Sequence, residues 1–293
     1  MKVGIIGLGS MGRYLARHIY DDGFTLYVYD IRPECMEEIT KMGAIKAESP
    51  KEVGKNSDIV ILMVNTYSQC LDCLNGEEGL LRGMEGGIVI VSCTIAFDEA
   101  HAIEYLCMDA GIQMLDAPVS GGTRGAMDRA LTVMAAGDEE VYNKCLPVLK
   151  CIGDKIVRVG SQIGQGQKMK AINQLLVGIH MVATAEAFCM GARCGLDLQM
   201  LYDIIKSSAG TSRIFESRGQ SIIARDFSTR STLSIQVKDM NISLKTADSV
   251  KSPIFLGHVC QELFKIAEAR YTNTDDSSSV IKIYEELYSH PSE

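Results

Sequence analysis

The sequence lacks several features that would place it in a specialised class of protein. Its 293 residues contain no block of basic side chains, and a net charge of −8 disfavours a nucleic acid or a membrane as partner. The five histidines are isolated and make no metal-binding pattern, so we expect no metal. No signal peptide, internal repeat or low-complexity tract is visible. These absences favour a globular, cytoplasmic protein.

The ten cysteines lack the pattern of a disulfide framework or a zinc site. They are scattered through apolar segments, and the C-x-x-C pair Cys70 and Cys73 has no second pair and no neighbouring histidine. Reduced thiols buried in a cytoplasmic protein explain this distribution best. We therefore expect Cys70 and Cys73 to pack on a helix.

The first half of the chain alternates short apolar segments with helical stretches such as Met36–Met42 and Ala100–Ala110. The expected strands are Val3–Ile6, Phe24–Tyr29, Ile59–Val64, Gly87–Ser92, Ile112–Leu115, Leu131–Ala135 and Ile156–Val159. Several are apolar without interruption, as strands buried on both faces of a parallel sheet are. The pattern predicts an α/β Rossmann-type doubly wound sheet with a mixed edge.

The second half of the chain is predicted to be helical. Lys168–Gly195 contains no proline and few charges, and a helix of this span is about 40 Å long, as a central helix joining two domains would be. The polar side chains within it argue against a membrane span. Further helices are expected at Leu198–Ser207, Ile214–Ala224, Ile235–Val250, Ile254–Tyr271 and Ser279–Tyr288. The expected domains are an α/β domain over residues 1–162 and an all-α domain over residues 163–293, with the boundary near Ser161–Gly164.

A glycine pattern, G-x-G-x-x-G, follows the first predicted strand and precedes a helix. In this pattern Gly7 permits the tight turn, Gly9 lets the backbone approach a pyrophosphate, and Gly12 lets the helix pack on the strand. The N–H groups at the start of the helix then attract the phosphates. The cofactor-binding residues expected here are Gly7, Leu8, Gly9, Ser10, Met11 and Gly12.

Asp30 ends the second apolar segment, about 20 residues beyond the glycines. A carboxylate at this position accepts hydrogen bonds from the adenosine ribose and repels a 2′-phosphate, which favours NAD over NADP. Arg32 lies two residues further on and could hold such a phosphate, remain a solvated charge or stack on adenine. We expect Asp30, Ile31 and Arg32 at the adenosine end of the cofactor.

Two further clusters carry chemical groups. Asp116-Ala-Pro-Val-Ser-Gly-Gly122 follows a strand, and its Ser-Gly-Gly offers a hydroxyl and bare N–H groups that suit a carboxylate. Gly164-Gln-Gly-Gln-Lys-Met-Lys170-Ala-Ile-Asn173 opens the long helix, where Lys170 and Asn173 share one face. The structural alternative for Lys170 is a side chain that extends to solvent from the helix start.

These motifs, in this order, resemble those of the β-hydroxyacid dehydrogenase family, also called 3-hydroxyisobutyrate dehydrogenase-like. The resemblance extends over essentially the whole chain. The glycine pattern, D-A-P-V-S-G-G and G-x-G-x-x-x-K-x-x-N all match. Lys238-Asp239 also matches, with Met240 where the family usually has leucine. The resemblance implies an NAD-dependent enzyme that oxidises a small hydroxy acid by hydride transfer.

The resemblance also implies a role for each matching residue. Lys170 would be the general acid/base, Asn173 would hold the substrate hydroxyl or a neighbouring oxygen, and Ser120, Gly121 and Gly122 would bind the carboxylate. An ordinary lysine pKa of about 10.4 is too high for an efficient base at neutral pH. A dry cleft and two nearby positive groups, the oxidised nicotinamide and Lys238, would have to lower the pKa of Lys170. Beyond the glycine pattern and Asp30–Arg32, the implied cofactor-binding residues are Val64, Asn65, Thr94 and Lys238.

Within the family, some whole segments resemble the L-threonate dehydrogenase group. They are Val64-Asn65, where many relatives have a proline, Ile214–Arg218, Asp226–Ser231 and Asp275–Ile283. This likeness predicts L-threonate or a similar four-carbon aldonate as substrate and a role in carbohydrate acid metabolism. It rests on segments and not on a known specificity residue.

Other functions remain open at this point. 3-Hydroxyisobutyrate, tartronate semialdehyde and a hydroxymethyl dicarboxylate share the carboxylate and would fit the same motifs. An imine reductase is disfavoured, because similar enzymes generally lack the lysine present here as Lys170. A dinucleotide-binding sensor is the alternative outside enzymes. The family implies a homodimer or homotetramer.

Overall fold

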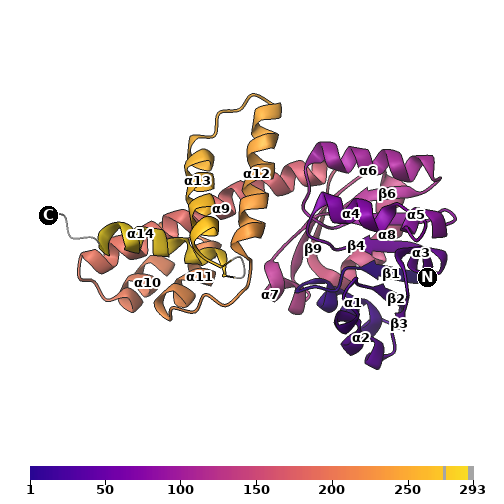
Figure 1. Ribbon diagram of the computed structural model, residues 1–293, viewed down its shortest axis with the longest axis horizontal. Coiled ribbons are helices and arrows are strands. Elements are labelled where there is room, and N and C mark those ends of the chain that lie inside the picture. Colours follow the sequence, from indigo (N-terminus) through magenta and orange to yellow (C-terminus); the bar gives the residue numbers. More distant parts are fainter. Residues whose placement is uncertain (273–274, 290–293) are drawn as a thin grey trace. The chain divides into compact units, whose positions relative to one another are not determined.

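The computed structural model describes residues 1–272 and 275–289, and the chain divides into two compact units (Figure 1). Unit 1 comprises Met1–Lys170, and unit 2 begins at Ala171. The division falls inside the long helix α9 (Gln165–Arg193). The boundary expected at Ser161–Gly164 lies just before this helix.

Unit 1 is built on one sheet of nine strands. Its elements in chain order are β1 (Lys2–Ile6), α1 (Gly12–Asp21), β2 (Thr25–Tyr29), η1 (Pro33–Met36), α2 (Glu37–Met42), β3 (Ile45–Lys46), α3 (Pro50–Lys55), β4 (Ile59–Leu62), α4 (Tyr67–Leu74), α5 (Leu80–Gly83), β5 (Ile88–Val91), α6 (Phe97–Asp109), β6 (Gln113–Asp116), β7 (Val119–Ser120), α7 (Gly122–Met127), β8 (Leu131–Ala136), α8 (Glu139–Ile152), β9 (Gly153–Gly160) and the start of α9.

The strand order is β3-β2-β1-β4-β5-β6-β8-β7, with β9 paired to β8. The strands from β3 to β6 are parallel, whereas β8 runs antiparallel to β6 and β7. This is the doubly wound sheet with a mixed edge that the sequence predicts. The short strands β3 and β7 were not expected, because two residues are too few for a recognisable apolar pattern.

Helices cover both faces of this sheet, as α4 and α6 above it and α1 below it show in Figure 1. Ile59 and Ile61 of β4 lie in the core shared with α1 and α8, and Val60 and Leu62 lie in the core shared with α4 and α6. Successive side chains of a strand point to opposite faces, so a strand buried on both faces is apolar throughout. This explains why the central strands could be recognised from the sequence.

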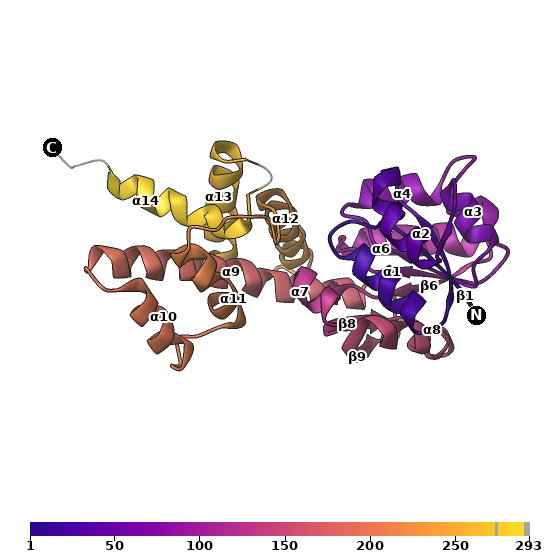
Figure 2. The same ribbon diagram turned by 90° about the horizontal axis from the view of Figure 1, so that it is seen from below.

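Unit 2 is helical in the described residues. Its elements are the remainder of α9, α10 (Leu198–Lys206), α11 (Arg213–Ile223), α12 (Leu233–Ser249), α13 (Phe255–Arg270), η2 (Ser277–Val280) and α14 (Ile281–Ser289). Figure 2 shows α13 and α14 on one side of α9 and α10 and α11 on the other. Phe188 of α9 stacks on Phe215 at 5.4 Å, and Phe215 stacks on Tyr202 at 5.6 Å. The helix α12 approaches α9 closely at Gly178, where a Cβ atom would lie 2.4 Å from Met240 Sδ.

The helix α9 is long and apolar enough to span a membrane by length and composition, and 44% of its most apolar window is buried inside the protein. Met181, Ala185 and Phe188 of α9 belong to the unit 2 core, so α9 acts as a core helix. It extends over Gln165–Arg193, not Lys168–Gly195 as expected. Gly195 ends it with a φ of +73°, and the Leu196 N–H bonds back to the Gly191 carbonyl.

Candidate active site

The glycine loop joins β1 to α1 through close backbone contacts. Gly7 has a φ of +98°, and a Cβ atom there would lie 2.4 Å from the Met63 carbonyl oxygen. A Cβ atom on Gly12 would lie 2.0 Å from the Gly7 carbonyl oxygen. Gly9 differs, because beyond its chain neighbours the nearest described atom to its Cβ position is an Arg32 nitrogen at 3.8 Å. Gly7 and Gly12 therefore serve the fold, while the open backbone at Gly9 fits the pyrophosphate of a dinucleotide.

Asp30 follows β2 and is bonded to the glycine loop. Its Oδ2 accepts a hydrogen bond from the Leu8 N–H at 2.7 Å, and its Oδ1 accepts one from the Arg32 N–H at 2.9 Å. Arg32 Nε lies 3.3 Å from the same Oδ1, and this hydrogen bond raises the pKa of Arg32. Asp30 is buried, whereas Ile31 is 85% exposed and offers an apolar surface to an adenine ring. Both charges of the pair lie at the predicted ribose position, so the geometry fits NAD and NADP.

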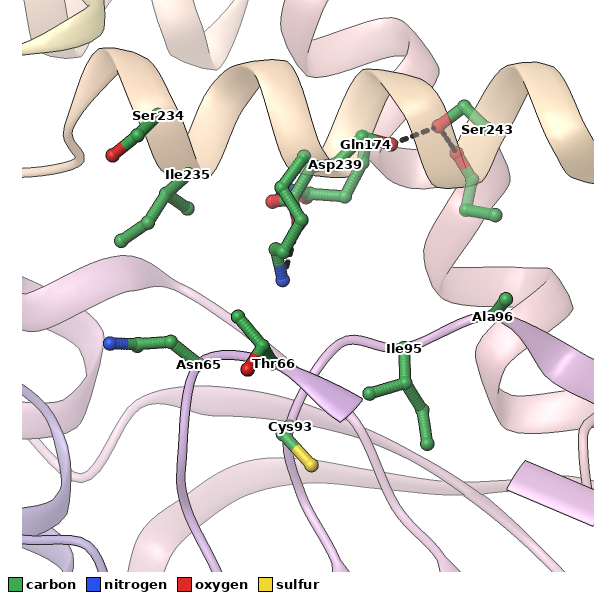
Figure 3. A network of polar contacts seen from close by, with 12 residues as sticks. Asn65, Thr66, Cys93, Ile95, Ala96, Gln174, Ser234, Ile235, Asp239 and Ser243 are labelled. Atoms are coloured by element: carbon green, nitrogen blue, oxygen red, sulfur yellow. Dashed lines mark hydrogen bonds and ion pairs between the residues drawn. The ribbon is translucent and has the colours of Figure 1, made fainter. Parts of the chain in front are cut away.

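The other cofactor residues predicted in unit 1 follow neighbouring strands. Val64 and Asn65 follow β4, and Thr94 follows β5. The carboxyl ends of parallel strands lie at one edge of a sheet, where ligands of such folds bind. Thr66 and Gln69 form a capping box at the start of α4, and the Gln69 Oε1 also accepts from the Asn65 N–H at 2.9 Å. Figure 3 shows Asn65 and Thr66 in this loop, whose backbone is thereby fixed.

The predicted carboxylate-binding turn follows β7. Ser120 pairs with Thr132 of β8 and is partly buried. Gly121 and Gly122, with φ of +139° and +62°, are exposed and lead into α7. Apart from its chain neighbours and its own helix backbone, no atom of the described residues lies within 4 Å of a Cβ position on Gly122, so this turn is open on that side. Its role in binding a carboxylate remains a prediction.

Asp116 ends β6, is fully buried and accepts hydrogen bonds from the start of α9. Its Oδ2 accepts from the N–H groups of Gly164 at 3.0 Å and Gln167 at 3.1 Å, and its Oδ1 accepts from Gln167 Nε2 at 2.8 Å. Burial raises the pKa of Asp116 to about 6, although these bonds and one from the Gly166 N–H act against the rise. A Cβ atom on Gly166 would lie 2.5 Å from the Met134 carbonyl oxygen, so a glycine is required for this approach.

Gln167 extends the network from Asp116 to the loop that follows β5. Its Oε1 accepts from the Ile95 N–H at 3.1 Å, and its Nε2 donates to the Cys93 carbonyl at 3.1 Å. Gln167 is only 1% exposed. The first turn of α9 is therefore held at the carboxyl edge of the sheet by β6 and by the loop that contains Thr94.

Lys170 lies three residues beyond Gln167 on α9, which is nearly one helical turn, and is 6% exposed. Lysine is rarely buried to this extent unless its charge is paired. The side chain therefore does not extend to solvent as the structural alternative required. Its catalytic role remains a prediction.

In unit 2, Asn173 begins a chain of hydrogen bonds. Asn173 Nδ2 donates to Gln174 Oε1 at 2.9 Å, and Gln174 Nε2 donates to Asp239 Oδ2 at 2.5 Å. Lys238 Nζ lies 3.0 Å from Asp239 Oδ1. Figure 3 shows Gln174 beside Asp239 of α12. These contacts orient the Asn173 amide and the Lys238 ammonium, whose roles toward substrate and cofactor remain predictions.

The cysteines are all free thiols. Cys70 and Cys73 lie on α4, and Cys70 Sγ is 3.1 Å from Cys93 Sγ in the core. Burial raises the pKa of Cys73 to about 11, which disfavours the thiolate that redox and metal chemistry require. Within residues 1–272 and 275–289, no group of three or more His, Cys, Asp and Glu side chains could hold a metal ion.

The sequence motifs gave no role to Asp116 or Gln167, although both lie within them. A local signal was present, because Gly164 precedes α9 and has no side chain to accept a hydrogen bond from its first N–H groups. Where the helix start is buried, another residue has to accept these bonds in place of water. The identity of that residue depends on which strand lies nearby, which only the tertiary structure provides.

Two family models match the chain. The NAD binding domain of 6-phosphogluconate dehydrogenase matches residues 2–160, and the NAD-binding domain of NADP-dependent 3-hydroxyisobutyrate dehydrogenase matches residues 164–284. Together the two models cover most of both units.

Full-length relatives and a solved structure agree with these matches. An L-threonate dehydrogenase from Cupriavidus necator is 38% identical over 97% of this chain and 96% of its own length. One from Pectobacterium atrosepticum is 36% identical over 96% and 93%. A crystal structure of 3-hydroxyisobutyrate dehydrogenase from Salmonella typhimurium has a TM-score of 0.91 and 34% identity, covering 97% of this chain and 99% of that one. Relatives at 31% identity are named 2-hydroxy-3-oxopropionate reductase (Escherichia coli) and mitochondrial 3-hydroxyisobutyrate dehydrogenase (Homo sapiens).

Proposed function

The chain belongs to the 3-hydroxyisobutyrate dehydrogenase-like family, and on this premise we propose that it oxidises L-threonate or a similar four-carbon sugar acid with NAD. At the level of the family it is a nicotinamide-dependent oxidoreductase that acts on the CH–OH group of a small hydroxy acid. The substrate, the catalytic lysine and the preference for NAD over NADP are the parts that we propose.

One structural observation carries the proposal. The turn of α9 before Lys170 is bonded to the loop that contains Thr94, at the sheet edge that also carries Gly9 and Asp30. A buried lysine on such an anchored helix can act as a base at a fixed position relative to this edge. This arrangement supports proton transfer by Lys170 better than a structural role.

In the proposed reaction, Lys170 takes the proton of the hydroxyl on the carbon next to the carboxylate. NAD⁺, when held at Gly9 and Asp30, would supply the hydride acceptor for that carbon, so that the hydroxyl would become a carbonyl as NADH forms. Asn173 holds the hydroxyl or a neighbouring oxygen, and the turn Ser120–Gly122 binds the carboxylate. Lys170 finally releases its proton, which balances the reaction as a 2-keto acid, NADH and one proton.

The choice of L-threonate rests on the relatives that carry this name at up to 38% identity. A substrate with several hydroxyls needs polar partners, and Ser120, Thr123, Asn173, Gln174 and Ser212 or Arg213 are the candidates that we propose. A site built on such donors rejects analogues that lack hydroxyls, because its polar groups are then left unpaired.

The test is a comparison of kcat/KM for L-threonate and 3-hydroxyisobutyrate, with NADH formation followed at 340 nm. We expect L-threonate to be at least about tenfold better, a difference of about 1.4 kcal/mol. If the branched acid is the better substrate, the assignment to L-threonate is wrong and 3-hydroxyisobutyrate dehydrogenase becomes the function. Tartronate semialdehyde, assayed as NADH consumption, tests the remaining alternative.

We also propose that the enzyme is cytoplasmic, as its ten free thiols favour, and forms a homodimer or homotetramer through unit 2. The helix α13 exposes apolar side chains along one stripe, with Phe255 80%, Val259 59% and Ile266 41% exposed. Apolar stripes of this kind commonly mark an interface. Light scattering of the purified protein tests the proposal, and a monomeric mass would contradict it.

A further inference from the structure

The start of α9 depends on a residue far away in the sequence. Helices commonly begin with a Ser, Thr, Asp or Asn whose side chain accepts the first N–H groups, as Asp138 does for α8. The residue before α9 is Gly164, which has no side chain. The carboxylate of Asp116 replaces the missing cap and accepts the N–H groups of Gly164, Gly166 and Gln167.

Gln167 fixes the orientation of the first turn of α9 relative to Asp116. Its amide is bonded at both ends, since Nε2 donates to Asp116 and the Cys93 carbonyl while Oε1 accepts from the Ile95 N–H. Each partner fits only one orientation of the amide. The first turn of α9 is thereby fixed both along the helix axis and in rotation about it.

We propose that Asp116 and Gln167 form a clamp, defined as these two side chains, that positions Lys170 for proton transfer. The inference rests on the proposed function of Lys170. Asp116 and Gln167 are positioning residues, because both are buried and their polar atoms are bonded to protein. Neither is expected to touch the substrate.

The helix transmits the geometry of the clamp to Lys170. Lys170 is three residues from Gln167 and four from Gly166, so the three residues lie on one side of the same helical turn. A shift or rotation of the first turn therefore moves the lysine by a similar amount. A misplacement of about 1 Å costs about 100-fold in rate when a reacting group must be aligned.

A cap that only stabilises the fold is the competing explanation. Loss of such a cap lowers the free energy of unfolding by about 1 kcal/mol and leaves kcat of the folded enzyme unchanged. The clamp predicts in addition that kcat falls when the side chains at positions 116 and 167 can no longer pair as acceptor and donor.

The main test is Asp116→Asn, which preserves size but places an N–H₂ group opposite Gln167 Nε2, so that two donors face each other. We expect kcat for the best hydroxy acid to fall between about 10- and 100-fold. The KM for NAD and the affinity for NADH, measured by fluorescence, should stay within about threefold. The rate should also become more sensitive to deuterium on the reacting carbon, because misplacement slows the chemical step.

A rescue variant separates the clamp from general damage. In Asp116→Asn/Gln167→Glu the acid and the amide exchange places, so the new amide donates to the new carboxylate, while the Cys93 carbonyl loses the donor that Gln167 Nε2 supplies and the rescue is only partial. Gln167→Glu alone places two carboxylates in contact. We expect each single variant to have a lower kcat than the double variant, and a double variant that is as slow as the two single effects combined would overturn the proposal.

The matched control is Asp138→Ala, which removes the cap of α8 from the same unit. It should lose about 1 kcal/mol of stability and keep kcat within about twofold. An Asp116→Asn enzyme that is folded and equally active would overturn the clamp. If Asp116→Asn does not fold, Gln167→Met is used, since the backbone bonds to Asp116 remain, and an unchanged kcat there also overturns the clamp.

Failure of the proposed function is recognised separately. If Lys170→Ala retains turnover, the role of Lys170 is wrong whatever the clamp variants do. Hydrogen exchange then still decides whether the clamp exists, because Asp116→Asn should accelerate exchange in peptides that cover residues 164–170 and Asp138→Ala should not. Unchanged exchange in those peptides contradicts the clamp.

Discussion

Each unit contains one fully buried carboxylate that accepts several backbone N–H groups, and the two carboxylates differ in what they hold. Asp116 in unit 1 has a neutral partner, Gln167, and holds the start of the helix that carries Lys170. Asp276 in unit 2 has a charged partner, Arg218, whose Nε lies 3.2 Å from its Oδ1. Asp276 also accepts the N–H groups of Ser231 at 3.0 Å and Ser278 at 3.1 Å.

The comparison shows how the segments that the sequence analysis likened to L-threonate dehydrogenases are held in unit 2. Asp276 joins three of them, because Arg218 ends Ile214–Arg218, Ser231 ends Asp226–Ser231, and Ser278 lies in Asp275–Ile283. These segments are therefore held together by the fold of unit 2. Changes near Lys170 in unit 1 should therefore alter kcat. Changes in the Asp276 cluster, defined as Asp276, Arg218, Ser231 and Ser278, should alter the free energy of unfolding.

Replacement of Lys170 by alanine should give the largest effect, a loss of kcat without a loss of stability. Loss of a general acid/base costs about 10²–10⁴ in kcat, while removal of a buried amine should leave the fold intact. Steady-state kinetics and NADH binding measure the two properties separately. A variant within a few-fold of the wild-type rate would show that Lys170 is structural. The claim that the region near Lys170 controls turnover would then be wrong.

Asp276→Asn should have the opposite profile. It leaves the Arg218 guanidinium partly buried without its counter-charge, which costs about 3–5 kcal/mol of unfolding free energy. The kcat of the molecules that remain folded should be close to wild type, as active-site titration with NADH and urea unfolding can establish. A large loss of kcat with little loss of stability would mean that the Asp276 cluster takes part in catalysis.

The dependence of the free energy of unfolding on pH tests the environment of Asp116. Its pKa is raised from 3.8 to about 6 in the folded protein, so between these values the folded state binds more protons than the unfolded state. Raising the pH through this window therefore lowers the free energy of unfolding, by up to about 3 kcal/mol. Urea unfolding of wild type and Asp116→Asn should give a difference that changes between about pH 4 and pH 7. A difference that is constant with pH contradicts the raised pKa.

The smallest effect is expected at the cofactor. Wild type should prefer NAD to NADP by at least about tenfold in kcat/KM, because the Asp30 carboxylate repels a 2′-phosphate. Asp30→Asn keeps an acceptor for the Leu8 N–H and frees Arg32 from its ion pair, so the preference should shrink. Equal or better kinetics with NADP in the wild type would assign Arg32 to the 2′-phosphate.

The fold could be predicted from the sequence wherever a local pattern sufficed. The central strands β4 and β5 are apolar throughout because both of their faces are buried, and Gly7 and Gly12 mark the turn that packs α1 on β1. The sequence predicts that the segment from Gly164 opens the long helix and that Lys168–Gly195 is its apolar span, but it does not predict the cap of α9, which comes from Asp116, 48 residues before Gly164. Local signals could not reveal this contact.

The candidate site divides in the same way. Lys170 and Ser120–Gly122 are predicted from local motifs and from the family resemblance, and their roles stay predictions. Gln167 could not be predicted in this way, because its function depends on two groups, the Cys93 carbonyl and the Ile95 N–H, which the folded sheet brings to α9. A residue whose contacts come from distant segments is thus harder to recognise from sequence than one that lies in a local motif.

The most direct test of the central claim follows the hydride. L-Threonate that carries deuterium at the carbon next to the carboxylate is incubated with the enzyme and NAD⁺, and the reduced cofactor is examined by mass spectrometry and NMR. The proposed reaction predicts deuterated NADH from the wild type, with deuterium at C4 of the nicotinamide, and about 10²–10⁴-fold slower formation by Lys170→Ala. Formation of NADH without deuterium, or no NADH from L-threonate while 3-hydroxyisobutyrate is oxidised, would contradict it.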